Sequence, residues 1–184
     1  MDRKVFLKNA LGCLGCAILP TISAAKPTAA DQPAQTPAMD PAALREWLSQ
    51  FVAKQEGHMN REALVTLLEE RGRACCKALT FRQDLIRDSK GSVDKLVELM
   101  GKIVGPENCT RQGDQITLVY PVKKCVCGWS PERGTPKADD PYCECSKANN
   151  QSLFETVSGK PVKVQVAESQ RRNGKPCRFL IQLA

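Results

Sequence analysis

Cysteine is the residue type in this chain whose spacing most directly implies chemistry. The sequence has 10 cysteines, and two pairs are separated by a single residue, Cys125 with Cys127 and Cys143 with Cys145. In a β-strand, residues two apart face the same side about 6.6 Å apart, so each pair would present two thiols to one object. Paired thiolates suit soft metals and clusters. These four cysteines are therefore candidate ligands of an iron–sulfur cluster or another thiolate-bound metal.

Further cysteines extend this candidate metal site. Cys177 alternates with Phe179 and Ile181 in an apolar strand pattern and is expected to face the core beside the two pairs. Cys75 falls on the apolar side of a predicted helix, and Cys76 follows it directly. The full set of candidate metal ligands is Cys75, Cys76, Cys125, Cys127, Cys143, Cys145 and Cys177.

Two other uses of the cysteines stay open at this stage. An even number of cysteines in an exported protein favours disulfide bonds, which would join the pairs to each other or to the helix. Redox or thiol catalysis is the other use, with Cys75 and Cys76 as candidates. The neighbouring Arg71, Arg73 and Lys77 would lower the pKa of a thiol there.

The sequence contains few other candidates for catalysis. It has one histidine, His58, so a zinc site would have to use cysteine ligands. It contains no phosphate-binding glycine loop and no nucleophile elbow. Glu144 and Glu155 are candidate general bases in a pocket. These residues do not decide whether the protein is an enzyme.

Residues 1–25 predict a signal peptide. Arg3, Lys4 and Lys8 precede an uncharged apolar stretch over 10–22, and small residues follow at 23–25. The start resembles the twin-arginine translocation (Tat) signal, with Lys4 in place of the second arginine, and Tat signals typically serve proteins that fold, often around a metal, before export. The general secretory route stays open. A membrane span needs roughly 20 apolar residues, so we expect a periplasmic or otherwise exported protein without a stable membrane span in its mature part.

The rest of the chain has the size of one domain. Residues 26–39 are rich in Pro, Ala, Thr and Gln and predict a flexible linker, whereas residues 40–184 predict a single cysteine-rich domain. The net charge is +7 and falls to +5 after residue 25, with scattered basic residues and few aromatic ones. This pattern argues against nucleic acid as a partner. The expected partners are a metal or small-molecule ligand and a redox protein.

Apolar periodicity predicts the helices that would position the cysteines. Asp40 and Pro41 begin a helix over 41–56, and Asn60 begins a second helix whose apolar stripe runs to Ile86, with Gly72 loosening its middle. A third, shorter helix is expected from Ser92 to about residue 102.

The periodicity changes to that of strands after Gly113. Residues 116–122 alternate, and 124–128 would continue or pair with that strand. Ser146 would cap a short helix ending at Gly159, and strands are expected at 162–166 and from Cys177, joined by a turn at 173–174. The predicted fold class is α+β, with N-terminal helices followed by an antiparallel sheet that contains one inserted short helix.

The C-terminal part carries several short motifs: Cys-Val-Cys-Gly-Trp at 125–129, Tyr-Cys-Glu-Cys at 142–145, Phe-Glu at 154–155 with Gly159 and Pro-Val at 161–162, and Asn-Gly at 173–174 before Cys-x-Phe-x-Ile at 177–181. These motifs resemble an uncharacterised group of small bacterial cysteine-rich proteins. More distantly they are similar to L-2-amino-thiazoline-4-carboxylate hydrolase-like and 4-vinyl-reductase-like domains. The resemblance implies an α+β ligand-binding domain with a pocket between helices and sheet.

Three functional hypotheses follow from these features. The first is an exported cysteine-rich protein that binds a metal or iron–sulfur centre through the paired C-x-C motifs, for electron transfer, metal handling or sensing. The second is a small-molecule hydrolase or reductase with a helix–sheet pocket. The third is a disulfide-stapled periplasmic ligand-binding module.

Overall fold

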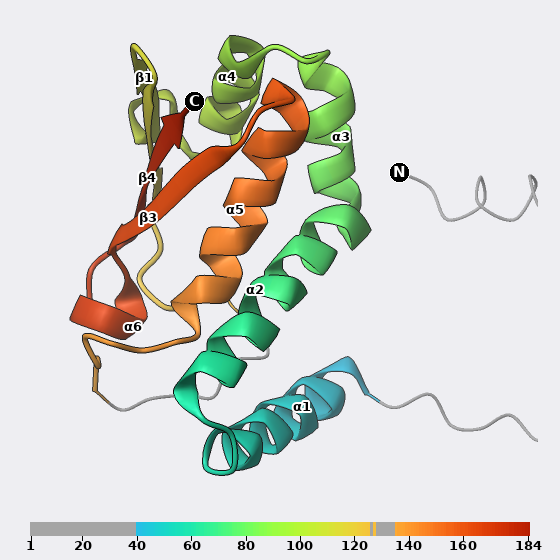
Figure 1. Ribbon diagram of the computed structural model, residues 1–184, viewed down its shortest axis with the longest axis vertical. Coiled ribbons are helices and arrows are strands. Elements are labelled where there is room, and N and C mark those ends of the chain that lie inside the picture. Colours follow the sequence, from blue (N-terminus) through green and yellow to red (C-terminus); the bar gives the residue numbers. More distant parts are fainter. Residues whose placement is uncertain (1–39, 126, 128–134) are drawn as a thin grey trace, which may run out of the picture. The chain divides into compact units, whose positions relative to one another are not determined.

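The computed structural model describes residues 40–125, 127 and 135–184. They lie in one compact unit, Met39–Ala184, in which helices and a four-stranded sheet pack together (Figure 1). The predicted signal peptide at 1–25, the linker at 26–39 and part of the loop that precedes Pro141 lie outside the described residues.

The first helices begin at the predicted caps. Helix α1 spans Pro41–Glu56, and the carboxylate of Asp40 accepts a hydrogen bond from the Ala42 amide. Helix α2 spans Arg61–Ala78, with the Asn60 side chain accepting from the Ala63 amide. Both caps satisfy amide groups that have no partner within the first turn of a helix.

The prediction of one long second helix from the apolar stripe is wrong, because the helix is interrupted at Leu79. The backbone of Leu79 is extended (φ −80°, ψ 116°), and helix α3 then runs over Thr80–Ser89. The interruption changes the direction of the apolar residues that follow it. Leu85 of α3 therefore packs in the core with helix α4, Val93–Val104. Ser92 caps α4, as the sequence predicts.

The sheet is antiparallel throughout, in the order β1-β2-β4-β3. The short 3₁₀ helix η2, Pro106–Asn108, leads into β1 (Cys109–Gln112), and a turn at Gly113 leads into β2 (Gln115–Tyr120). Strand β3 is Val162–Glu168, the short helix α6 is Gln170–Asn173, and β4 is Cys177–Leu183. The predicted turn at 173–174 is therefore the end of a short helix.

The inserted helix is longer than the sequence predicts. Helix α5 spans Cys143–Ser158, so it begins at Cys143 and not after a cap at Ser146. Its start is held by Asp140, whose carboxylate accepts from the Tyr142 amide at 2.9 Å. Cys143 and Cys145 consequently lie on a helix. Residues 124, 125 and 127 have no strand structure either, which corrects the predicted extension of β2.

The helices cover one face of the sheet and enclose the main core. Helix α5 packs between α2 and β3 (Figure 1), and the core combines side chains from α2 to α5 with those of all four strands. The alternating residues Ile116 and Leu118 on β2 and Phe179 and Ile181 on β4 are each almost fully buried. The fold class is thus α+β, as predicted. Among the described residues, no helix combines the length and apolar character needed to cross a membrane.

Candidate functional site

Six cysteines lie in the region around the first turn of α5, where the ionisation of one affects the pKa of the next. In this order they are Cys75, Cys145, Cys127, Cys125, Cys177 and Cys143. The series draws on α2, the segment after β2, α5 and β4, which are distant in sequence. We call these six residues the cysteine group. It contains every predicted ligand except Cys76.

The closest pair in the cysteine group is the first C-x-C motif. The side chains of Cys125 and Cys127 are hydrogen-bonded to each other, and Cys127 Sγ lies 3.1 Å from Ser146 Oγ of α5. The Cys145 thiol is also close enough to act on Cys127. Cys125 and Cys127 are therefore in contact, and Cys145 lies in the same region.

The second C-x-C motif does not face one object, because it lies on a helix. Successive helical residues turn by about 100°, so Cys143 and Cys145 point in directions about 200° apart. Cys145 packs with Leu64 and Leu68 of α2 and neighbours Cys75. Cys143 faces the other way. The prediction that both members of this pair face one ion on a strand is wrong.

Cys143 joins the opposite end of the cysteine group. Its thiol donates a hydrogen bond to Ser169 Oγ, at 3.2 Å, and Ser169 is the cap of α6. Ionised Cys177, at the start of β4, would raise the pKa of Cys143, so the two thiols lie in the same region of the fold. Cys177 packs against the core and also neighbours Cys125, as expected from its strand position.

The remaining two cysteines of the domain lie outside the group. Cys76 is 1 % exposed and belongs to the main core, where its thiol is hydrogen-bonded to Ser152. Cys75, which the apolar stripe predicts to face inward, is the more exposed of the two neighbours. Cys109 is buried at the start of β1, and burial raises its pKa to about 11.

Burial raises the pKa of four thiols of the cysteine group, those of Cys127, Cys143, Cys145 and Cys177. Desolvation raises the pKa of Cys145 to about 12, with Cys75 adding to the effect. The hydrogen bond with Cys125 and then burial raise the pKa of Cys127 far above its usual range. A metal ion would have to displace these protons. In the part of the chain that the structure describes, no three Cys, His, Asp or Glu side chains are already arranged to hold one.

The two candidate general bases are held in ion pairs. Glu144 binds Arg172 at 2.6 Å and also Lys147, which in turn binds Glu69 of α2 at 2.9 Å. Burial alone would raise the pKa of Glu144, but these cations lower it overall. Glu155 binds Arg73 at 2.8 Å, and its pKa is lowered in the same way. Both carboxylates are therefore weaker bases than free ones.

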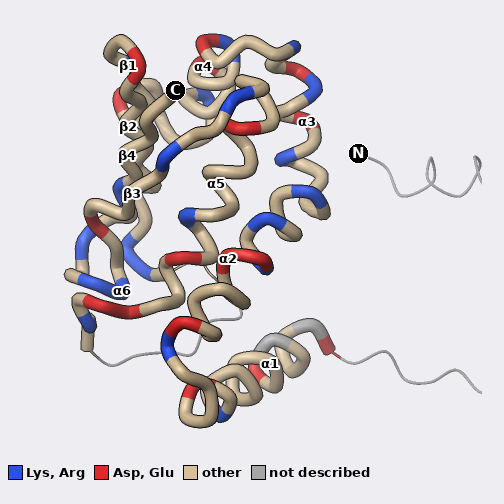
Figure 2. The backbone as a smooth tube through the Cα atoms, in the orientation of Figure 1, with Lys and Arg blue, Asp and Glu red and all other residues tan. Residues whose placement is uncertain are grey.

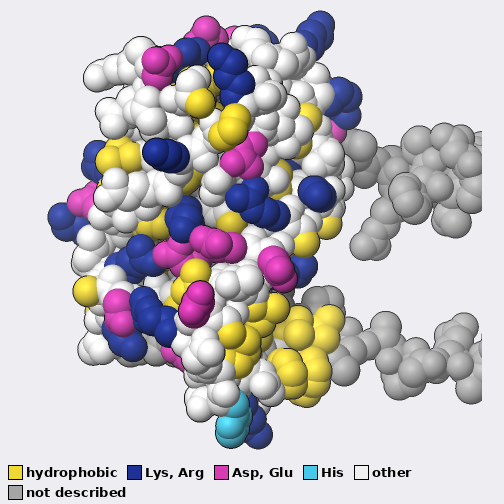
Figure 3. All heavy atoms as spheres, viewed as in Figure 1, with side chains coloured by type: hydrophobic (Ala, Val, Ile, Leu, Met, Phe, Trp, Pro, Cys, Tyr) yellow, Lys and Arg dark blue, Asp and Glu magenta, His cyan; other side chains and the backbone are white. Residues whose placement is uncertain are grey.

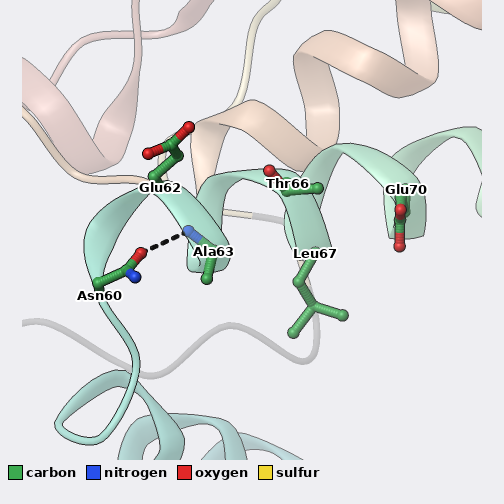
Figure 4. A pocket seen from close by; sticks show the side chains of 6 residues that line it. All are labelled: Asn60, Glu62, Ala63, Thr66, Leu67 and Glu70. Atoms are coloured by element: carbon green, nitrogen blue, oxygen red, sulfur yellow. Dashed lines mark hydrogen bonds between the residues drawn. The ribbon is translucent and has the colours of Figure 1, made fainter.

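A hollow of about 420 Å³ lies elsewhere, on the exposed side of α2. Its lining side chains do not converge on one point (Figure 4), and no cysteine is among them: they are Asn60, Glu62, Ala63, Thr66, Leu67 and Glu70. The hollow is not the helix–sheet pocket that the resemblance implies.

Helix α1 carries an exposed apolar patch, and the single histidine of the sequence lies near it. Figure 3 shows an apolar patch over α1, to which Leu44, Trp47 and Phe51 contribute. The Trp47 and Phe51 rings are stacked at 5.6 Å. His58 is exposed beside this helix, away from the cysteine group in sequence and contacts.

Comparison with known proteins adds no family to this description. No family model matches the chain, and no curated protein matches it significantly.

Proposed function

We propose that this exported protein binds a soft metal ion through the cysteine group, with Cys125 and Cys127 as the principal ligands. The observation that carries the proposal is the contact between these two thiols, with Cys145 as their neighbour. The group supplies sulfur ligands only, and thiolates favour soft metals such as Cu(I), zinc and iron–sulfur clusters. Metal handling or sensing in the periplasm is the role that fits this chemistry.

The arrangement favours an ion that needs few ligands. Structural zinc sites and iron–sulfur clusters use about four protein ligands. A soft monovalent ion such as Cu(I) can be held by a pair of thiolates, with a third adding to the site. The first C-x-C motif offers such a pair, whereas Cys143 and Cys145 point apart on α5. The proposal therefore narrows from a cluster to a single soft ion held by Cys125 and Cys127, with Cys145 beside them.

The proposal is tested by titrating the reduced, full-length protein with Cu(I) under nitrogen in competition with a coloured chelator. We expect wild-type protein to remove the ion from the chelator and to develop a thiolate-to-metal band in the near ultraviolet. Cys127→Ser removes one of the two principal ligands, so its affinity should fall by about tenfold or more.

Cys109→Ser is the matched control, because Cys109 is a buried thiol of β1 outside the cysteine group, and burial is the cause of its raised pKa. It should bind Cu(I) like the wild type. The proposal is wrong if wild-type protein takes no metal from the chelator, or if Cys127→Ser and Cys109→Ser bind equally well. Circular dichroism of both variants checks that each has folded.

A disulfide-stapled module is the second candidate function, and one observation favours it. Cys177 of β4 raises the pKa of Cys143 on α5, and Cys75 of α2 raises that of Cys145 on α5, so a disulfide within either pair would join two elements of the fold. Peptide mass mapping of protein taken from the periplasm would detect Cys143–Cys177 and Cys75–Cys145 bridges. Their presence in all molecules would support this candidate for those four cysteines.

A further inference from the structure

Arg82 is a buried cation of helix α3 that pairs only with uncharged groups. It is 6 % exposed, and its guanidinium contacts side chains of α4, α5 and β2. Nη2 donates to Tyr120 Oη at 3.0 Å and to Asn150 Oδ1 at 3.1 Å. Nη1 points to Met100 Sδ at 3.8 Å. These acceptors satisfy part of the guanidinium group but neutralise none of its charge.

The charge and one donor of Arg82 stay uncompensated within the described chain. No carboxylate of the described residues forms an ion pair with it, and its buried Nε has no hydrogen-bond partner. The other buried arginine differs, because Arg171 Nε lies 3.0 Å from Asp140 Oδ1. Removing a charge from water is costly unless an opposite charge and hydrogen bonds replace the solvent. Arg82 thus needs a negative partner as Arg171 does, but no carboxylate of the described residues supplies one.

The nearby Cys76 does not supply the missing negative charge. Burial raises the pKa of the Cys76 thiol, and this outweighs the opposite effect of Arg82. The thiol therefore stays protonated near neutral pH. It is also engaged by Ser152, on α5.

We propose that Arg82 binds a small monovalent anion from solution at its unpartnered Nε, next to the α5 and β2 side chains that its guanidinium contacts. The anion is a halide or a small carboxylate such as formate, because Met100 and Asn150 beside Arg82 are each 1 % exposed, and a larger group would displace more of this buried packing. Phe81 covers the guanidinium, with Arg82 Cζ 5.0 Å from its ring centre, and is itself 49 % exposed. Rotation of this exposed side chain gives the anion its approach.

Thermal unfolding of the full-length, reduced protein tests this site. The bulky anion isethionate is replaced stepwise by chloride in one series and by formate in another, at constant ionic strength and pH. The unfolding midpoint of wild-type protein should rise and then saturate with at least one of them, because only the folded state has the site. A chloride response assigns a halide, and a formate response assigns a carboxylate.

Arg82→Met should abolish the saturable rise, and Arg73→Met is the matched control. Arg73 is a partly exposed arginine of α2 in an ion pair with Glu155, so its removal should leave the anion response intact. Arg82→Lys keeps a positive charge without the Nε donor, and should shift saturation to an about tenfold higher anion concentration even if the Met variant does not fold. No saturable response in wild-type protein, or an unchanged response in Arg82→Lys, would overturn the proposal.

Discussion

At Gly72, helix α2 lies directly against the backbone of α5. A Cβ atom at this position would lie 2.1 Å from the carbonyl oxygen of Cys145 and 3.0 Å from the Cβ of Ala148. The Gly72 carbonyl also accepts a hydrogen bond from Asn149 Nδ2 at 3.2 Å. The sequence position of Gly72 suggests that it loosens the middle of the helix, but its role in the structure is different. It lets the first turns of α5, with Cys145, lie against α2.

Replacing Gly72 by alanine should force the two helices apart. We expect Gly72→Ala to lower the free energy of unfolding by about 2–3 kcal/mol, the usual cost of overpacking, in spite of the better helix propensity of alanine. Urea unfolding under reducing conditions measures the change. Gly57→Ala is the control, because its Cβ would meet nothing closer than 3.6 Å and its backbone is right-handed (φ −73°), so its effect should be small. Equal effects of the two substitutions would contradict this account.

At the scale of elements, α6 is tied to the segment that precedes α5 by a buried ion pair. Asp140 is 0 % and Arg171 7 % exposed, and the Arg171 guanidinium also lies over the Tyr142 ring at 4.7 Å. Two hydrogen bonds join the same segments: Arg172 Nε donates to the Asp140 carbonyl oxygen, and the Lys137 amide donates to the Arg171 carbonyl oxygen. Figure 2 shows the acidic and basic segments next to one another around α6. Because α6 presents Ser169 to Cys143, this pair helps to position one end of the cysteine group.

Breaking the pair from one side should be more harmful than removing both partners. Arg171→Met leaves the buried Asp140 without its guanidinium, and we expect a loss of about 3–5 kcal/mol in the free energy of unfolding. The double variant Asp140→Asn, Arg171→Met should be less destabilised than the sum of its two single variants. Additive losses in urea unfolding would mean that the two residues do not depend on each other.

Several elements were predictable because their signals are local. The helix at 41–56, the caps at Asn60 and Ser92, and the strands at 162 and 177 depend on residues within one turn or on simple alternation. The break at Leu79 was not predictable, because it serves the packing of Leu85 against α4. The start of α5 was missed because no side chain caps it: the N-cap residue is Tyr142, whose amide is held by Asp140, and Ser146 lies inside the helix.

For the whole molecule, ion pairs of partly buried carboxylates predict instability in acid. Glu144 and Glu155 have folded-state pKa values that their cationic neighbours lower below normal. Stability from a lowered carboxylate pKa is present above the unfolded value of about 4.3 and is lost as the pH falls further. We expect Glu144→Gln to be less stable than wild type at pH 7 and to approach it near pH 3, measured by urea unfolding across this range.

Glu70→Gln provides the control for this pH dependence. Its free energy of unfolding should stay close to that of wild type, because Glu70 is exposed in the middle of α2, away from the helix N-terminus. A difference between Glu144→Gln and wild type that stays constant from pH 7 to pH 3 would contradict the assignment.

The sequence by itself determined the α+β class, the cysteine-rich character and most helix and strand positions, because these follow from composition and from periodicity over short windows. It also predicted the export signal and the metal hypothesis, which stay predictions. Only the tertiary structure decided which cysteines are neighbours. The C-x-C spacing has one meaning on a strand and another on a helix, and α5 turns Cys143 and Cys145 to opposite sides. The fold brings Cys75 into the region of Cys145 and Cys177 into the region of Cys143, and it surrounds Arg82 with neutral groups. These arrangements depend on segments distant in sequence, which no local pattern contains.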